Sequence, residues 1–251
     1  SWYRLAPVEE PQLPELIPNL MGVGQAGGCA VNTSAQLVCW GTNQFGTLGL
    51  NNKNYAYSIP QATGTAGTGT NFTDWEKVSV NGRSVCGLRN GGELWCWGRN
   101  GLNQLGNGVG SGYPCEDSSS SCTEHVVIPT RIGAYSDWVF AVAGGCGIRS
   151  NGRAYCWGVC PGDNATPCNG DDSLDNNIIN TYVHASKGPV EIKTDATYTA
   201  SPNTAFTDWV KIRKSAHGGC GLRANGELWC WGLNLAGTVG DGSATLVDPN
   251  D

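Results

Sequence analysis

The chain has 251 residues, a formal net charge of −6 and a pI of about 5.0. It has no basic surface for a phosphate backbone, so we expect no nucleic-acid partner. No apolar run approaches the ~18 residues of a membrane span and no signal sequence opens the chain, which begins at Ser1; we therefore expect no membrane span and a processed chain or a fragment.

Four pairs of cysteines mark an internal repeat. Within each pair the second cysteine follows ten residues after the first and precedes Trp-Gly, which places the repeats at 29–41, 86–98, 146–158 and 220–232. Repeats spaced by several tens of residues are typical of solenoids and propellers. Val, Trp and Tyr are frequent in them, Asn-Gly and Gly-Gly punctuate them, and no segment has a 3.6-residue apolar period. The sequence therefore predicts an all-β fold.

Each repeat reads as a β-hairpin, most clearly the fourth, where residues 224–226 form a three-residue loop between the cysteines. Such a loop normally combines a type I turn with a left-handed glycine, here Gly226. Gly152 and Gly92 take the same place in the third and second repeats. Counting outward, Arg223 then faces Glu227, and Trp229 faces a glycine that its ring is expected to cover.

The same count places the two cysteines of a repeat opposite each other, on the face that carries the leucines. At a non-hydrogen-bonded position their Cα atoms lie about 4.5 Å apart, within disulfide range. Zinc sites favour a closer cysteine spacing, and the chain has only three histidines. We expect six disulfides, the last two in loops: Cys29–Cys39, Cys86–Cys96, Cys146–Cys156, Cys220–Cys230, Cys115–Cys122 and Cys160–Cys168.

A disulfide framework of this density predicts an oxidising compartment, so we expect a secreted or cell-surface protein. Three N-x-S/T sequons agree with this and predict N-glycans, if the source is eukaryotic, on Asn32, Asn71 and Asn164. Three segments read as loop inserts that leave the repeat at one point and project from one face: 51–71, 110–124 and 159–205.

No catalytic, cofactor-binding or metal-binding constellation stands out. His125, His184 and His217 have no nucleophile motif nearby, and surface or structural histidine is the expected role for all three. The acidic stretch 169–177 offers oxygen atoms to Ca²⁺ but lacks the spacing of a known calcium loop, so a solvated loop is favoured. We expect no enzyme activity and no cofactor.

An acid-tryptophan step precedes three of the hairpins, and tails such as Trp40-Gly41-Thr42-Asn43 leading to Gly46-Thr47-Leu48-Gly49 follow three of them. Together these motifs resemble the repeat of the regulator of chromosome condensation family. The resemblance implies one β-propeller domain over 1–251, with about one four-stranded blade for each repeat and typically seven blades in a ring. Four repeats leave two readings: part of a larger ring, or a closed four-blade ring.

Function does not follow from this resemblance, because family members differ in activity and the nuclear role of the namesake is at odds with six disulfides. The expectation is a non-enzymatic scaffold that binds protein or glycan within a larger extracellular assembly. Its partners would include further copies or further blades of the same protein. The alternative is a secreted carbohydrate-active or lectin-like propeller.

Overall fold

The computed structural model describes residues 16–25, 27–64, 71–101, 103–108, 125–158, 190–191, 206–214 and 218–232. Every regular element in this part of the chain is a β-strand, which confirms the all-β prediction. The strands form four antiparallel sheets, and within each sheet consecutive strands pair in chain order. Each sheet is thus a meander built around one cysteine hairpin.

The strands are as follows. Sheet 1 contains β1 (Leu16–Gly24), β2 (Gly27–Asn32), β3 (Leu37–Thr42) and β4 (Ala56–Ala62). Sheet 2 contains β5 (Trp75–Asn81), β6 (Ser84–Arg89), β7 (Glu93–Gly98) and β8 (Val126–Arg131). Sheet 3 contains β9 (Trp138–Val142), β10 (Cys146–Arg149), β11 (Ala154–Cys156) and β12 (Val190–Glu191). Sheet 4 contains β13 (Trp209–Lys214), β14 (Gly218–Arg223) and β15 (Leu228–Gly232).

Two of the predicted loop inserts contain a strand. Strand β4 lies inside 51–71 and β12 inside 159–205, and each pairs with the third strand of its sheet. The physical reason is that the third strand would otherwise leave a row of backbone groups unpaired. Pro60 in β4 and Pro129 in β8 suit this outer position, because a proline cannot donate to a further strand. The insert 110–124 lies outside the described residues.

The hairpin loops follow the prediction in sheets 3 and 4 and depart from it in sheet 2. Gly152 and Gly226 have φ of 73° and 88°, as a left-handed third loop residue requires. Ala35 takes this place in sheet 1 with φ of 55°. In sheet 2, Asn90 and Gly91 both have positive φ, so the turn is of type I′ and not type I. The Asn-Gly pair is the favoured sequence for that turn.

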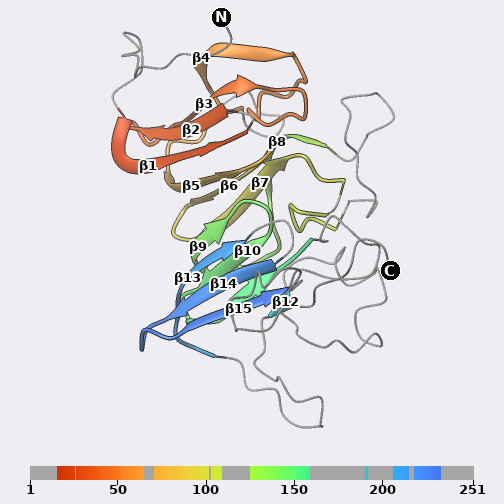
Figure 1. Ribbon diagram of the computed structural model, residues 1–251. Helices are drawn as coiled ribbons and strands as arrows, with labels where there is room; N and C mark the ends of the chain where they lie inside the picture. The colour runs from red at the N-terminus through yellow and green to blue at the C-terminus, as the bar shows by residue number, and fades with distance from the viewer. Residues whose placement is uncertain are drawn as a thin grey trace, which may run out of the picture.

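The sheets pack face to face in chain order and form three separate cores (Figure 1). The cysteine-bearing face of each sheet, here called its trailing face, meets the opposite or leading face of the next sheet. Between sheets 2 and 3, for example, Leu88, Leu94 and the Cys86–Cys96 pair lie against Trp138 and Trp157. The cores thus combine disulfides and tryptophans with Leu, Ile and Val side chains.

Sheets 1 and 4 lie at opposite ends of this stack, with sheets 2 and 3 between them (Figure 1). The described sheets therefore form an open arc and not the closed four-blade ring. In the described part of the chain, no further sheet packs against the trailing face of sheet 4.

Candidate binding surfaces

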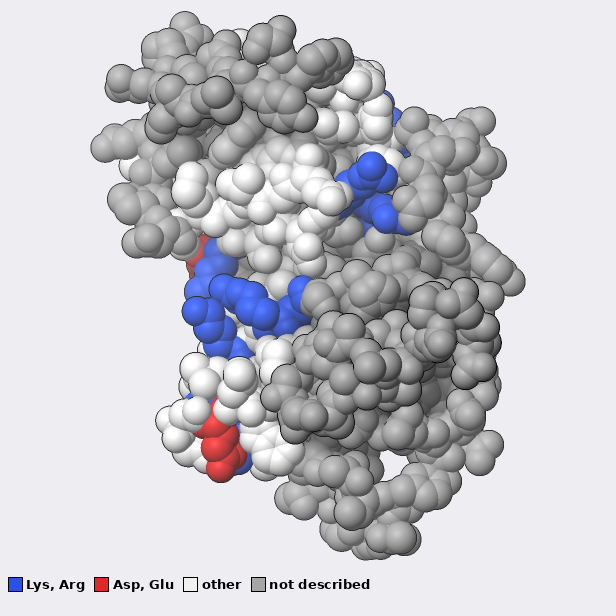
Figure 2. All heavy atoms as spheres, viewed as in Figure 1, with Lys and Arg blue, Asp and Glu red and all other residues white. Residues whose placement is uncertain are grey.

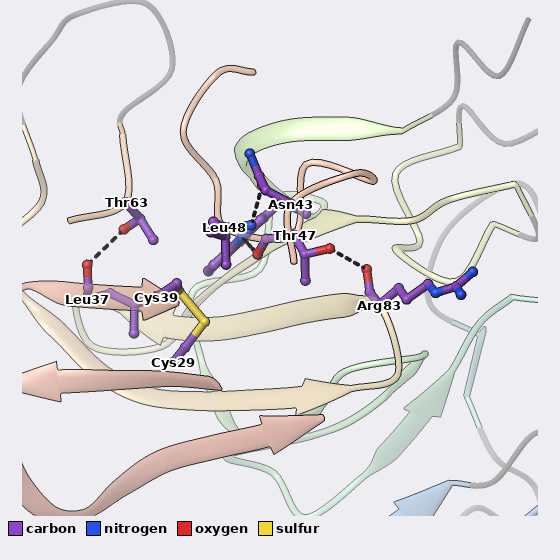
Figure 3. Close-up of a disulfide and its surroundings, with 9 residues drawn as sticks. Cys29, Leu37, Cys39, Asn43, Thr47, Leu48, Thr63 and Arg83 are labelled. Carbon is purple, nitrogen blue, oxygen red and sulfur yellow. Dashed lines mark hydrogen bonds between the residues drawn. A yellow bond between two sulfur atoms is a disulfide. The ribbon is translucent and has the colours of Figure 1, made fainter. Parts of the chain in front are cut away.

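One disulfide crosses each hairpin at the place that the ten-residue spacing predicts. Cys29 pairs with Cys39, Cys86 with Cys96, Cys146 with Cys156 and Cys220 with Cys230, with Cα atoms 4.0–4.1 Å apart. The first three disulfides are buried between sheets, whereas the fourth is half-buried. Figure 3 shows the first disulfide below the tail of its repeat. The Cys115–Cys122 and Cys160–Cys168 pairs lie outside the described residues.

A buried asparagine organises the tail that follows each of the first two hairpins. The side-chain oxygen of Asn43 accepts the backbone N–H of Leu48 at 2.9 Å, and Asn100 accepts that of Leu105 at 3.1 Å (Figure 3 for Asn43). Both asparagines are fully buried. This bond holds the leucine of each tail in the core and explains the asparagine in the repeat.

In the second and third repeats, the tryptophan after the second cysteine joins the repeat to the one before it. The indole N–H of Trp97 donates to the carbonyl oxygen of Thr47 at 2.9 Å, and that of Trp157 donates to Gln104 at 3.0 Å. Both rings are buried. Blade packing therefore accounts for these tryptophans, and they offer no exposed ring for a ligand.

In sheets 2, 3 and 4, the hairpin glycine is covered by a different aromatic ring from the one that lies opposite it in the register. Gly221 does lie opposite Trp229, but a Cβ at Gly221 would meet the ring of Trp209 at 2.3 Å. Trp75 covers Gly87 and Trp138 covers Gly147 in the same way. The covering ring comes from the first strand of the sheet, and its atoms lie so close to this position that only a glycine leaves room.

An arginine clamp recurs at the loop end of sheets 2, 3 and 4. Arg89 donates two bonds of 2.8 Å to Asp74 and stacks on Phe72, with its guanidinium carbon 3.6 Å from the ring centre. The same arrangement holds in the other two sheets: Arg149 with Asp137 and Tyr135, Arg223 with Asp208 and Phe206. The bonds from Arg149 lower the pKa of the Asp137 carboxyl. Sequence reasoning found only the Glu partners, although each acid and arginine recur in register.

Of the remaining candidates, only His125 lies within the described residues. His125 is buried, with its ring edge-on to Phe45; His184, His217 and the stretch 169–177 lie outside the described residues. Within the described ranges no three His, Cys, Asp or Glu side chains group as a metal site, and no helix is long and apolar enough to cross a membrane.

The three sequons differ in accessibility. Asn71 is exposed, and Asn164 lies outside the described residues. Asn32 is buried, its amide nitrogen donates to Gln36, and its oxygen accepts two backbone N–H groups. Glycosylation at all three stays a prediction, and the burial of Asn32 counts against that site.

Lysine and arginine side chains gather around β9 and β13 although the whole chain is acidic (Figure 2). On β13, Lys211 and Arg213 are exposed, and from β5 the ammonium of Lys77 donates to the carbonyl oxygen of Val139 at 2.6 Å. The ammonium of Lys214 donates to Trp157 O at 2.8 Å, and burial lowers its pKa to about 7. Lys77 and Lys214 therefore join neighbouring sheets.

Comparison with known proteins identifies the repeat and the fold. The family model for the regulator of chromosome condensation (RCC1) repeat matches residues 75–104. A search of curated proteins finds no significant match.

Two solved propellers are similar in structure. Human WBSCR16 superposes with a TM-score of 0.65 at 20% identity over 94% of this chain and 52% of its own. Prp20p from Saccharomyces cerevisiae, studied with its binding to Gsp1p and histones, superposes with a TM-score of 0.59 at 16% identity, over 93% of this chain and 49% of its own. The chain thus spans about half the length of each. At this identity the likeness establishes the fold and no activity.

Proposed function

We propose that this chain, which has the fold of the RCC1-type β-propellers and carries their repeat, is a secreted non-enzymatic scaffold that binds other protein in an extracellular assembly. The observation that carries the proposal is the placement of one disulfide in every sheet, three of them at the centre of an inter-sheet core. Disulfides persist in oxidising compartments and are rare where thiols are kept reduced.

The inter-sheet cores make these disulfides part of the fold. In a reducing compartment, eight thiols would replace four bonds, three of which lie within the inter-sheet cores. Each bond that closes a short hairpin contributes roughly 3 kcal/mol in the chain-entropy model. A cytosolic version of this protein would lose that contribution four times over.

Binding is the activity that suits this architecture. The described side chains with perturbed pKa, such as Asp137 and Lys214, are engaged in contacts within or between sheets. Partners can bind the exposed connections between sheets or the two ends of the arc. Loops that a rigid scaffold holds in place are common binding sites.

The compartment is tested by expressing the full chain in parallel with and without a secretory leader. We expect the exported protein to be folded, with no titratable thiol, and the cytosolic protein to be reduced and aggregated. A matched pair of variants, Asn71→Gln and Asn32→Gln, reads the glycans by mass. A reduced cytosolic protein that is fully folded would contradict the secreted assignment.

Binding is tested separately, with the exported protein on a glycan array and against a panel of generic hydrolase substrates. The scaffold proposal expects no turnover and no glycan retention above background. Specific retention of a glycan would favour the lectin-like alternative, and turnover that survives purification to homogeneity would overturn the non-enzymatic assignment.

A further inference from the structure

The trailing face of sheet 4 is not covered by a further sheet in the described structure. Leu228 is 67% exposed and Leu222 37%, whereas Leu94 and Leu88, at the same positions of sheet 2, are 0% and 2% exposed. The Cys220–Cys230 disulfide on this face is half-buried, while its three counterparts are buried. Apolar groups that are core in three sheets therefore face solvent in the fourth.

The hairpin loop of sheet 4 lacks the contact that its counterparts make. The loop carbonyls of Ala35, Gly92 and Gly152 each accept the backbone N–H of a tryptophan that begins the next sheet, at 3.0 Å. No described residue donates to the carbonyl of Gly226. A Cβ placed on Gly152 would lie 1.9 Å from Thr207 of the next sheet, but one placed on Gly226 would have nothing within 4 Å.

The opposite end of the arc has exposed apolar groups at complementary positions. Met21 and Val23 of β1 are 55% and 70% exposed. By register they correspond to Val78 and Val80 of β5, which pack against the core between sheets 1 and 2. Leu16 lies opposite Asn32 in sheet 1, just as Trp75 lies opposite Arg89 in sheet 2. The backbone N–H of Trp75 donates to the hairpin loop of the preceding sheet, so the backbone N–H of Leu16 is at the position of that donor.

We propose that the trailing face of sheet 4 binds the leading face of sheet 1 from a second copy of this chain. The occupant is a leading face because each of the three observed interfaces joins a trailing face to a leading face. Such a head-to-tail interface is heterologous and closes into a ring where the rotation allows. Sheet 1 of this chain carries such a leading face, with Met21 and Val23 exposed, so a second copy can supply it.

This inference rests on the proposed assembly function and names its partner. It assigns Gly226 O as the acceptor for Leu16 N–H of the second copy, and it places Met21 and Val23 of that copy over Leu222 and Leu228. Both contacts extend an interface type that the molecule already contains three times.

The test is the mass of the oxidised, exported chain by light scattering at about 1 to 200 µM. We expect a species of twice the 26.4 kDa chain mass, apart from glycans. Leu228→Glu and Val23→Glu should each weaken association at least about 30-fold, as a charge at the centre of an apolar interface does. Because both side chains are exposed, neither variant should unfold the chain; Ile59→Glu, at an exposed position on β4, is the matched control.

Mixing the two variants tests the direction of the interface. Leu228→Glu keeps an intact leading face and Val23→Glu an intact trailing face, so the 1:1 mixture should regain a dimer through one interface. A monomer at every concentration would overturn the proposal, and so would a Val23→Glu dimer as stable as the wild type, which indicates trailing faces bound to each other. Neither result bears on compartment or glycan binding, so the two proposals fail independently.

Discussion

At the scale of the residue, glycines allow the sheets to approach closely. Gly87, Gly147 and Gly221 leave room for a tryptophan ring, and the loop glycines Gly92 and Gly152 combine positive φ with close contact to the next repeat. These two roles can be separated, because Gly152 and Gly226 have similar φ and different surroundings. Adding a Cβ atom at each of these two glycines therefore separates the effect of packing between sheets from that of backbone conformation.

Gly152→Ala should destabilise the protein more than Gly226→Ala. Both place an L-residue in the left-handed region, at a cost of roughly 1–2 kcal/mol. Only at Gly152 does the new Cβ lie 1.9 Å from the backbone oxygen of Thr207, which adds about 1–3 kcal/mol of overpacking. Chemical denaturation of both variants under non-reducing conditions provides the measurement. Equal losses would show that sheet 4 does not contact Gly152 in this way.

Lys214 should make stability rise with pH. Its pKa is lowered to about 7 in the folded protein from an ordinary 10.5, so between these values the unfolded chain binds more protons. Stability then increases as pH rises through 7 and approaches 10.5, and it is lowest below pH 7, where the folded protein must hold a charged ammonium. The half-buried side chain keeps part of its hydration, so we expect a shallow slope.

Lys214→Met removes the titrating group and keeps the length of the side chain. The difference in thermal midpoint between wild type and this variant, measured from about pH 6 to pH 9.5, should move in favour of the wild type as pH increases. A constant difference would mean that the ammonium is as well solvated in the fold as in the unfolded chain.

At the scale of the element, the same type of hairpin contributes differently to stability according to whether another sheet covers it. Sheets 2 and 4 share the spacing of the cysteines, the arginine clamp and the paired leucines. In sheet 2 a following sheet covers the disulfide, whereas in sheet 4 it is half-buried. The two hairpins therefore separate the effect of ring closure from that of burial.

Replacing Cys86 and Cys96 by alanine should cost more than replacing Cys220 and Cys230. Both rings join residues ten apart, so the chain-entropy contribution is the same, about 3 kcal/mol. The first replacement also removes two buried sulfur atoms from a core and leaves a cavity, worth about 1 kcal/mol more. The measurement is the free energy of unfolding in urea. A larger loss for the second pair would contradict the open face of sheet 4.

The sequence predicted the hairpins better than their surroundings. Loop length, register and opposed cysteines follow from counting residues between Cys220 and Cys230, because hairpin geometry is local. Sequence analysis missed Asp74, Asp137 and Asp208 as clamp partners because each precedes the first strand of its sheet, 12 or 15 residues before its arginine. Sequence analysis missed the strand β4 because it lies within a segment interpreted as a loop insert and none of its residues is buried. Ile59-Pro60, repeated as Ile128-Pro129, was the available signal of an outer strand.

At the scale of the whole molecule, the open arc makes stability uneven along the chain. Sheets 2 and 3 are covered on both faces, whereas the trailing face of sheet 4 has no following sheet in the described structure. In repeat proteins each unit is stabilised by its neighbours, so a unit with one neighbour opens more readily. Amide protection should therefore fall from the middle sheets toward sheet 4.

Hydrogen exchange of the two matched hairpins tests this directly. At concentrations that keep the chain monomeric, amides of β14 and β15 should exchange at least about tenfold faster than those of β6 and β7, since only the latter are covered by a following sheet. The shared disulfide ring and clamp exclude local hairpin stability as the cause. Raising the protein concentration should slow amide exchange in β14 and β15 and leave it unchanged in β6 and β7. The reason is that association covers the trailing face of sheet 4, whereas that of sheet 2 is already covered. Equal exchange rates of the two hairpins in the monomer would mean that a neighbouring sheet contributes nothing to hairpin stability. The trailing face of sheet 4 would then not be an interface that lacks its partner.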